Sequence, residues 1–283
     1  MLATYISSQR LSLRDLLLPW RIIASLSSYR SLLKQFTTRE IEKRYKGTLF
    51  GFLWSLITPL MMLIVYTIVF GFIFHGSYGH PGETKIQFAL GLFCGLLVWD
   101  FIAGCIALAP ALMVNNANFV TKVIFPLEIL PMAMVFAALV HTAIGFVPLV
   151  FLLLISQGSI PLTAFFLPSI FIPILFYALG TVWTLSALGV FLRDIVAMMP
   201  AVLTTIMFMS AIFFPITVVP ASWQWVIMIN PVAVLISMVR NAVVFGQSPD
   251  FNLYFIQVAV SLFVAIGGYA LFMKVKPAFA DVL

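Results

Sequence analysis

The chain has 283 residues, of which 63% are hydrophobic and 8% are charged, and its formal net charge is +6. Soluble domains carry roughly 25% charged residues, so this composition excludes a water-soluble fold and indicates an integral membrane protein with lipid-facing apolar surface. The cations lie near one end and in short loops, which favours a role in membrane orientation over nucleic-acid binding.

The first predicted element is an amphipathic helix over 29–46, YRSLLKQFTTREIEKRYK, lying on the membrane surface. Tyr29, Leu32, Leu33 and Phe36 fall on one face at the spacing i, i+3, i+4 and i+7. The cations of this stretch suit anionic lipid headgroups. A juxtamembrane anchor with no further role is the alternative interpretation.

Six apolar segments follow, each long enough to cross a hydrocarbon core about 30 Å thick at about 1.5 Å per helical residue. In chain order they are 49–74, 88–114, 131–156, 162–191, 196–215 and 252–273. The expected fold is therefore all-α, with a cytoplasmic N-terminal segment at 1–48 and a transmembrane domain of six helices at 49–283.

The segment 216–251 is also apolar, but proline, asparagine and glycine residues interrupt it. Its apolar pieces, 222–229 and 232–245, are short for a full crossing, and we interpret them as external re-entrant helices between the fifth and sixth spans. The alternative is a seventh span from Pro231 to Gly246, which would place the C-terminus outside.

The distribution of positive charge predicts the orientation. Nine of the fifteen Lys and Arg residues precede the first span, so the positive-inside rule places that end in the cytoplasm. The later cations predicted to be cytoplasmic are Lys122, Arg193, Lys274 and Lys276. Only Lys85 and Arg240 fall outside. Six spans then keep both termini cytoplasmic.

The sequence carries few signs of catalytic chemistry. It has no G-x-x-x-x-G-K-[ST] motif, and so no phosphate-cradling loop of that type for ATP hydrolysis. Histidine, cysteine and carboxylate residues do not cluster at metal-ligand spacing, and we expect no metal site. Asp100 and His141 are ionisable residues within spans. We interpret Asp100 as hydrogen-bonded or facing a water-filled cavity, and a catalytic role in lipid chemistry for either residue is an alternative.

Aromatic residues with polar handles are candidates to line a conduit, because aromatic rings stack on the C–H faces of sugars. These candidates are Trp54, Tyr66, Trp99, Tyr177 and Trp183. Packing within the helix bundle is the simpler alternative for each of them.

Four segments resemble the ABC-2 type permeases that export polysaccharides. The opening of that family resembles 39–74, REIEKRYKGTLFGFLWSLITPLMMLIVYTIVFGFIF, and its loop after the second span resembles 115–131, NNANFVTKVIFPLEILP. Its fourth-to-fifth connection resembles FLRDI at 191–195, and its external re-entrant helices resemble 213–246. The chain is most similar to Wzm-type permeases of O-antigen export, whose architecture is shared by capsule permeases of the KpsM type and by teichoic acid permeases.

This resemblance implies a homodimer in a bacterial inner membrane that exports a lipid-linked polysaccharide. It implies a separate Wzt-like ATPase that binds ATP and Mg²⁺, so that this chain has no cofactor and catalyses no reaction itself. The residues implied for coupling to the ATPase are Asn115, Asn116, Asn118, Lys122, Glu128, Arg193 and Asp194. The asparagines would cap a short helix, and Lys122 would supply a contact charge. A small-molecule or drug permease of the same family and an intramembrane lipid-modifying enzyme are the alternatives.

The resemblance also gives the basic stretch before the first span a second interpretation. Arg39, Lys43, Arg44 and Lys46 would lie at headgroup height, where the diphosphate of a lipid-linked glycan would be. Arginine binds phosphate bidentately. Positive-inside orientation explains the same charges without any substrate.

Overall fold

The computed structural model describes residues 28–46 and 49–283, so residues 1–27 of the expected cytoplasmic segment lie outside the described part. All regular structure in the described residues is helical. The α-helices are α3 (Arg30–Tyr45), α4 (Trp54–Tyr66), α5 (Lys85–Leu108), α6 (Ala117–Thr121), α7 (Ile129–Gln157), α8 (Leu167–Phe191), α9 (Ile195–Phe208), α10 (Gln224–Ile229), α11 (Pro231–Val243), α12 (Phe251–Val275) and α13 (Phe279–Val282). The shorter 3-10 or π-helical elements are η1 (Gly51–Leu53), η2 (Thr67–Ile73), η3 (Ala109–Ala111), η4 (Val114–Asn116), η5 (Leu162–Phe166), η6 (Ile216–Val218) and η7 (Lys276–Ala278).

Among the described residues, five helices are long and apolar enough to cross a membrane. They are Leu56–Ile73, Lys85–Ala111, Ile129–Gln157, Leu162–Phe191 and Phe251–Val282. These helices overlap five of the six predicted spans. The remaining predicted span, 196–215, contains α9, which has only 14 residues. The predicted re-entrant segment contains two shorter helices, α10 and α11.

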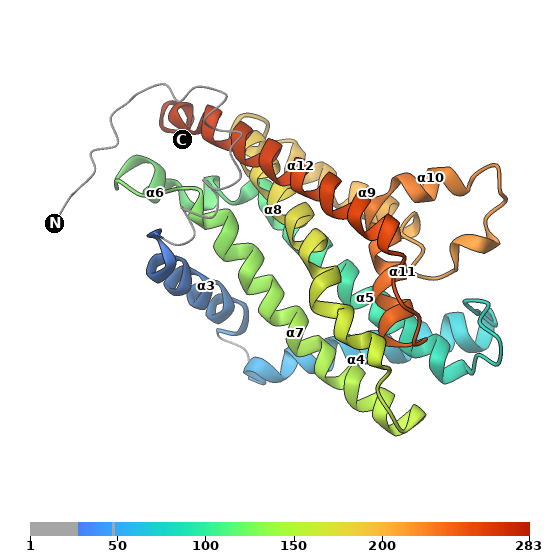
Figure 1. Ribbon diagram of the computed structural model, residues 1–283. Coiled ribbons are helices and arrows are strands. Elements are labelled where there is room, and N and C mark those ends of the chain that lie inside the picture. The colour runs from blue at the N-terminus through green and yellow to red at the C-terminus, as the bar shows by residue number, and fades with distance from the viewer. Residues whose placement is uncertain (1–27, 47–48) are drawn as a thin grey trace.

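The long helices α5, α7, α8 and α12 run side by side as a bundle (Figure 1). α12 packs along α8, and α3 and α5 both pack on α7. α6 and the C-terminus lie at one end of the bundle, which we call the α6 end (Figure 1). The connections from α4 to α5 and from α7 to α8 lie at the opposite end, which we call the far end (Figure 1).

Glycine allows two helices of this bundle to meet closely. A Cβ atom at Gly268 of α12 would lie 2.2 Å from the backbone oxygen of Gly180 on α8, so this crossing excludes any side chain. Close backbone approach at small residues is the usual basis of helix association in lipid, where van der Waals packing holds the helices together.

α9 ends at Phe208, and 209–214 form turns where the sequence predicted a continuing span. Three backbone oxygens in this stretch accept hydrogen bonds from distant side chains: Met209 O from Asn230 Nδ2 (3.2 Å), Ala211 O from Arg240 Nη2 (2.7 Å) and Ile212 O from Tyr78 Oη (2.6 Å). Ala211 also has a left-handed φ of 50°. These donors pair backbone oxygens that lie beyond the end of α9, which explains why the helix can stop here.

Two of these donors, Arg240 and Tyr78, are buried and contact each other. Arg240 of α11 is 2% exposed, and its guanidinium carbon lies 3.9 Å from the ring centroid of Tyr78. Burial raises the pKa of Tyr78 to about 12, against an opposing effect of the Arg240 charge, so its hydroxyl stays protonated as a donor. Arg240 is therefore a buried structural cation, whereas the prediction of orientation treated it as a charge in an external loop.

Candidate functional site

The α6 end is built on an aromatic contact between α3 and the loop that contains α6. The ring of Phe36 lies 5.3 Å from that of Phe119 and 5.0 Å from that of Phe125, measured between centroids. The Arg39 guanidinium lies 5.7 Å from the rings of Phe36 and Phe119. Phe36, on the predicted apolar face of α3, therefore packs on this loop, and α3 also packs on α7.

The turn after α6 exposes apolar side chains. Ile124 is fully exposed and Val123 is 55% exposed, beside the exposed Lys122. The α8–α9 connection exposes a similar mixture of apolar and charged groups. α13 contacts both α6 and α8 and so lies between the two exposed segments. We call this set the α6-end surface: Lys122, Val123, Ile124, Leu192, Arg193 and Asp194.

The sequence analysis named Lys122, Arg193 and Asp194 as coupling residues but missed Leu192, Val123 and Ile124. An apolar pair close to a predicted span is easily assigned to lipid contact or to the core. The signal that could have identified Val123 and Ile124 was their position between Lys122 and Pro126, outside both α6 and α7.

The predicted capping role of the asparagines is wrong for α6. Asn116 precedes the helix, but its side chain makes no capping hydrogen bond. Its Nδ2 instead donates to Leu112 O at 2.9 Å and thus holds the preceding turn. Asn115 and Asn118 are exposed.

Glu128 was expected to contact a partner, but the structure directs it inward. Its side chain is 8% exposed, and Lys276 Nζ donates to Glu128 Oε2 at 2.7 Å. Its backbone oxygen also accepts a hydrogen bond from Trp183 Nε1 at 3.3 Å. Glu128 therefore joins the start of α7 to α8 and to the C-terminal end, and it lies outside the α6-end surface.

A cavity of about 840 Å³ lies between α3, α4, α5 and α7. Its polar lining includes Lys43 and Arg44 from α3, Asp100 from α5 and His141 from α7. Most of the remaining lining is apolar, with Trp54 at the start of α4. Glu40 and Asp100 offset the charges of Lys43 and Arg44, so this lining suits an amphiphile that has a polar headgroup and an apolar chain.

The four basic residues predicted to contact lipid phosphate separate into two groups. Lys43 and Arg44 line the cavity, and Lys43 also pairs with Glu40. Arg39 lies against aromatic rings at the α6 end, and Lys46 is exposed outside the cavity lining.

The predicted conduit aromatics also separate. Trp54 lines the cavity, and Tyr66 is half-buried against Phe213, with ring centroids 5.7 Å apart. The other three residues are buried between helices, where they pack against protein and not against an open surface: Trp99, Tyr177 and Trp183.

Comparison with known proteins identifies the family. The family model described as ABC-2 type transporter matches residues 31–244. The O-antigen export system permease protein RfbA of Klebsiella pneumoniae is 25% identical over 89% of this chain and 95% of its own length. The protein of the same name from Myxococcus xanthus is 24% identical over 92% of this chain and 98% of its own length. The polysialic acid transport protein KpsM of Escherichia coli is 23% identical over 82% of this chain and 89% of its own length.

These relatives are named as export permeases or transport proteins, and the family is one of transport subunits. The alternative of an intramembrane enzyme that uses Asp100 or His141 therefore has no support, although both residues line the cavity. By a family match that covers most of its length, the chain belongs to the ABC-2 type transporters.

Proposed function

We propose that this chain is the transmembrane subunit of an ABC transporter that exports a lipid-linked polysaccharide of the O-antigen type across a bacterial inner membrane. A separate Wzt-like ATPase, which binds ATP and Mg²⁺, supplies the energy, and two copies of this chain form the permease. The observation that carries the proposal is the family match together with relatives named for O-antigen export that align over almost the whole chain. The relative named for polysialic acid transport makes capsule export the nearest alternative.

In this proposal the α6 end faces the cytoplasm and both termini lie inside. Four cations outside the N-terminal segment then fall on the cytoplasmic side, and Lys85 falls outside. The buried Arg240 contributes no loop charge, so the asymmetry is stronger than a plain count suggests. α9 forms the fifth crossing with the turns that follow it, and α10 and α11 are the external re-entrant helices.

The α6-end surface is the proposed docking site for the ATPase. The fully exposed Ile124 forms an apolar centre, and the charged rim is formed by Lys122 beside it and by Arg193 across α13. Interfaces between subunits commonly have this arrangement. We expect that replacing Lys122 or Arg193 by alanine uncouples ATP turnover from export and leaves membrane insertion intact.

The cavity between α3 and α7 is the proposed entry point for the lipid carrier. Asp100 lies 15 residues beyond Lys85, where α5 begins at the far end. At 1.5 Å per residue this is about 22 Å into a core of about 30 Å. The cavity then lies in the inner-leaflet half, where Lys43 and Arg44 can reach a lipid phosphate. A small-molecule or drug permease would use the same mixed lining for a free amphiphile.

The proposal is tested in cells that lack the chromosomal copy of this gene. The chain is expressed with its ATPase or with an ATPase whose hydrolysis is blocked, and surface polysaccharide is measured by lectin binding. Polysaccharide is expected on the surface only with the active ATPase. Equal export with the inactive ATPase would overturn the proposal, as would drug efflux with no polysaccharide export.

A further inference from the structure

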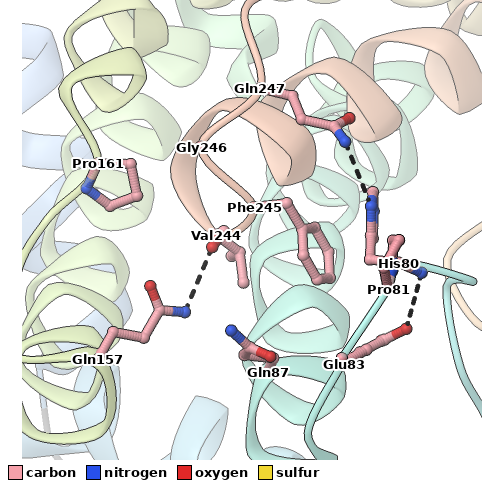
Figure 2. Close-up of a pocket in the computed structure, with 11 residues that line it drawn as sticks. His80, Pro81, Glu83, Gln87, Gln157, Pro161, Val244, Phe245, Gly246 and Gln247 are labelled. Atoms are coloured by element: carbon pink, nitrogen blue, oxygen red, sulfur yellow. Dashed lines mark hydrogen bonds between the residues drawn. The ribbon is translucent and has the colours of Figure 1, made fainter.

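A second cavity, of about 310 Å³, opens at the far end of the bundle. It is formed by the loop before α5, the connection between α7 and α8, and the residues after α11 (Figures 1 and 2). Its volume is at the lower end of the range of about 300–1,000 Å³ that is usual for ligand pockets. Among the residues that the structure describes, its lining shares none with the cavity between α3 and α7.

Primary amides dominate the polar lining. Three of the seven glutamines in the chain line this cavity, and they come from three different segments: Gln87, Gln157 and Gln247. Figure 2 shows the amides of Gln87 and Gln157 on the two sides of the space below Val244. Gln157 Nε2 donates to Val244 O at 3.3 Å, and Gln87 Oε1 accepts from Thr84 N at 2.9 Å. Within the described chain, Gln157 Oε1 and Gln87 Nε2 have no hydrogen-bond partner, so one acceptor and one donor remain for a ligand.

The other walls of the cavity are held in place by contacts within the chain. The His80 ring stacks on Phe245 with centroids 3.8 Å apart, and Gln247 Nε2 donates to His80 Nδ1 at 3.3 Å. The Glu83 carboxylate accepts hydrogen bonds from Ser77 Oγ at 2.7 Å and from the backbone N–H of Tyr78 at 2.8 Å. The cavity therefore has a rigid apolar wall and a carboxylate whose charge is already partly satisfied.

The charge of the lining disfavours anionic ligands. In the part of the chain that the structure describes, no lysine or arginine lines the cavity, and the Glu83 carboxylate would repel an anion. A phosphate or carboxylate ligand is thus disfavoured. Amides offer a donor and an acceptor to each hydroxyl group of a neutral ligand, and a small number of such groups in a partly apolar pocket is the usual basis of specificity.

We propose that this far-end cavity is a binding subsite for one neutral saccharide unit. The hydroxyl groups of the sugar bond to Gln87 Nε2 and Gln157 Oε1, and its C–H face lies toward Phe245 and Pro161. The statement that this sugar belongs to the exported polymer rests on the proposed function, which places the far end outside, where the polymer leaves. The subsite would hold the emerging chain against backward movement between transport steps.

The full chain in lipid nanodiscs, prepared without glycoside detergents, tests this subsite by saturation-transfer NMR. The probes are the methyl α-D-glycosides of glucose, galactose and mannose, the purified polymer of the source strain, and inorganic phosphate. We expect saturation transfer from the protein to at least one of the glycosides, and to the polymer if the polymer contains that sugar. Phosphate should not bind. Gln157→Met should weaken glycoside binding about tenfold, the loss expected for one hydrogen bond.

Gln224→Met is the matched control. Its Nε2 also donates to a backbone oxygen, Val219 O at 2.9 Å, but Gln224 lies outside the cavity. This variant should bind glycoside as the wild type does. The subsite is overturned if no glycoside binds, if Gln157→Met binds as tightly as Gln224→Met, or if phosphate is preferred. If the subsite is overturned while export still depends on ATP, the proposed function stands. If export occurs without the ATPase, the proposed function is overturned and the subsite is not.

Discussion

Arg44 and Lys46 lie two residues apart in one basic stretch, but only Arg44 lines the cavity between α3 and α7. Each contributes one positive charge to orientation, so replacing either by glutamine changes the positive-inside balance equally. We expect Arg44→Gln to lower surface polysaccharide about tenfold, because the proposed bidentate contact between Arg44 and a lipid phosphate would be lost. Lectin binding at matched membrane levels of the protein measures the effect.

Lys46→Gln is the control for that experiment and should export at nearly the wild-type level. Equal defects in the two variants would assign the basic stretch to orientation alone. Equal export at the wild-type level would exclude Arg44 from contact with the substrate.

Arg240 gives a prediction about stability. Arg240→Met leaves Ala211 O without its donor, which costs about 1–3 kcal/mol for a buried group, and removes a cation–π contact worth up to about 2 kcal/mol. The total loss is then about 1–5 kcal/mol, and at about 2–4 °C per kcal/mol Tm should fall by about 2–20 °C. Thermal unfolding of the purified protein, followed by tryptophan fluorescence, measures the change.

Lys85→Met is the control, since Lys85 Nζ also lies over a ring, 4.7 Å from the centroid of Phe72, but is exposed. Its Tm should change little. Tyr78→Phe keeps the ring and removes only the bond to Ile212 O, so its loss should be smaller than that of Arg240→Met. An Arg240→Met protein as stable as the wild type would mean that burying the cation costs as much as its contacts contribute.

At the scale of elements, the crossing of α8 and α12 depends on the contact between Gly180 and Gly268. Gly267 and Gly268 are neighbours, but a Cβ at Gly267 would meet nothing within 4 Å, whereas one at Gly268 would meet the Gly180 backbone. Alanine is favoured over glycine in a helix by about 1 kcal/mol. Gly267→Ala should therefore be neutral or raise Tm, while Gly268→Ala should lower Tm by several degrees. Equal changes would show that the two helices can separate without cost.

The long helices could be predicted from the sequence because their apolar runs are much longer than a soluble helix needs. The predicted 131–156 and 162–191 agree with α7 and with η5 and α8 to within about two residues. The early end of α9 could not be predicted, because the apolar run continues through 209–214. What ends the helix is a set of donors from Tyr78, Asn230 and Arg240, and no local pattern reveals those contacts.

At the scale of the whole molecule, the orientation can be measured with cysteine labelling. The native thiols Cys94 and Cys105 are buried, at 0% and 1% exposed, and should not react. In intact spheroplasts a membrane-impermeant maleimide should label Lys85→Cys, and it should label Lys122→Cys only after permeabilisation. The reverse pattern would place the α6 end outside and contradict the proposed docking of the ATPase.

The candidate sites were less predictable than the fold. Lys122 and Arg193 could be assigned to one end because the positive-inside rule and the order of the spans placed both loops on one side. The cavity could not be assigned, because its walls come from α3, α4, α5 and α7, and their relative rotation decides which residues face it. Trp99, Tyr177 and Trp183 illustrate the same limit, since composition does not distinguish a ring packed between helices from one that lines an opening.

The central claim is that a separate ATPase moves this permease by binding the α6-end surface. Ile124→Asp tests it most directly, since it places a charge at the apolar centre of that surface. Ile160→Asp is the control, because Ile160 is also exposed, at 41%, but lies in the α7–α8 connection at the far end. Both variants are measured for co-purification of the ATPase and for ATP-dependent export.

Ile124→Asp should lose both the bound ATPase and export, at a normal level of protein in the membrane, while Ile160→Asp should keep both. An Ile124→Asp permease that retains its ATPase and exports at the wild-type rate would contradict the account.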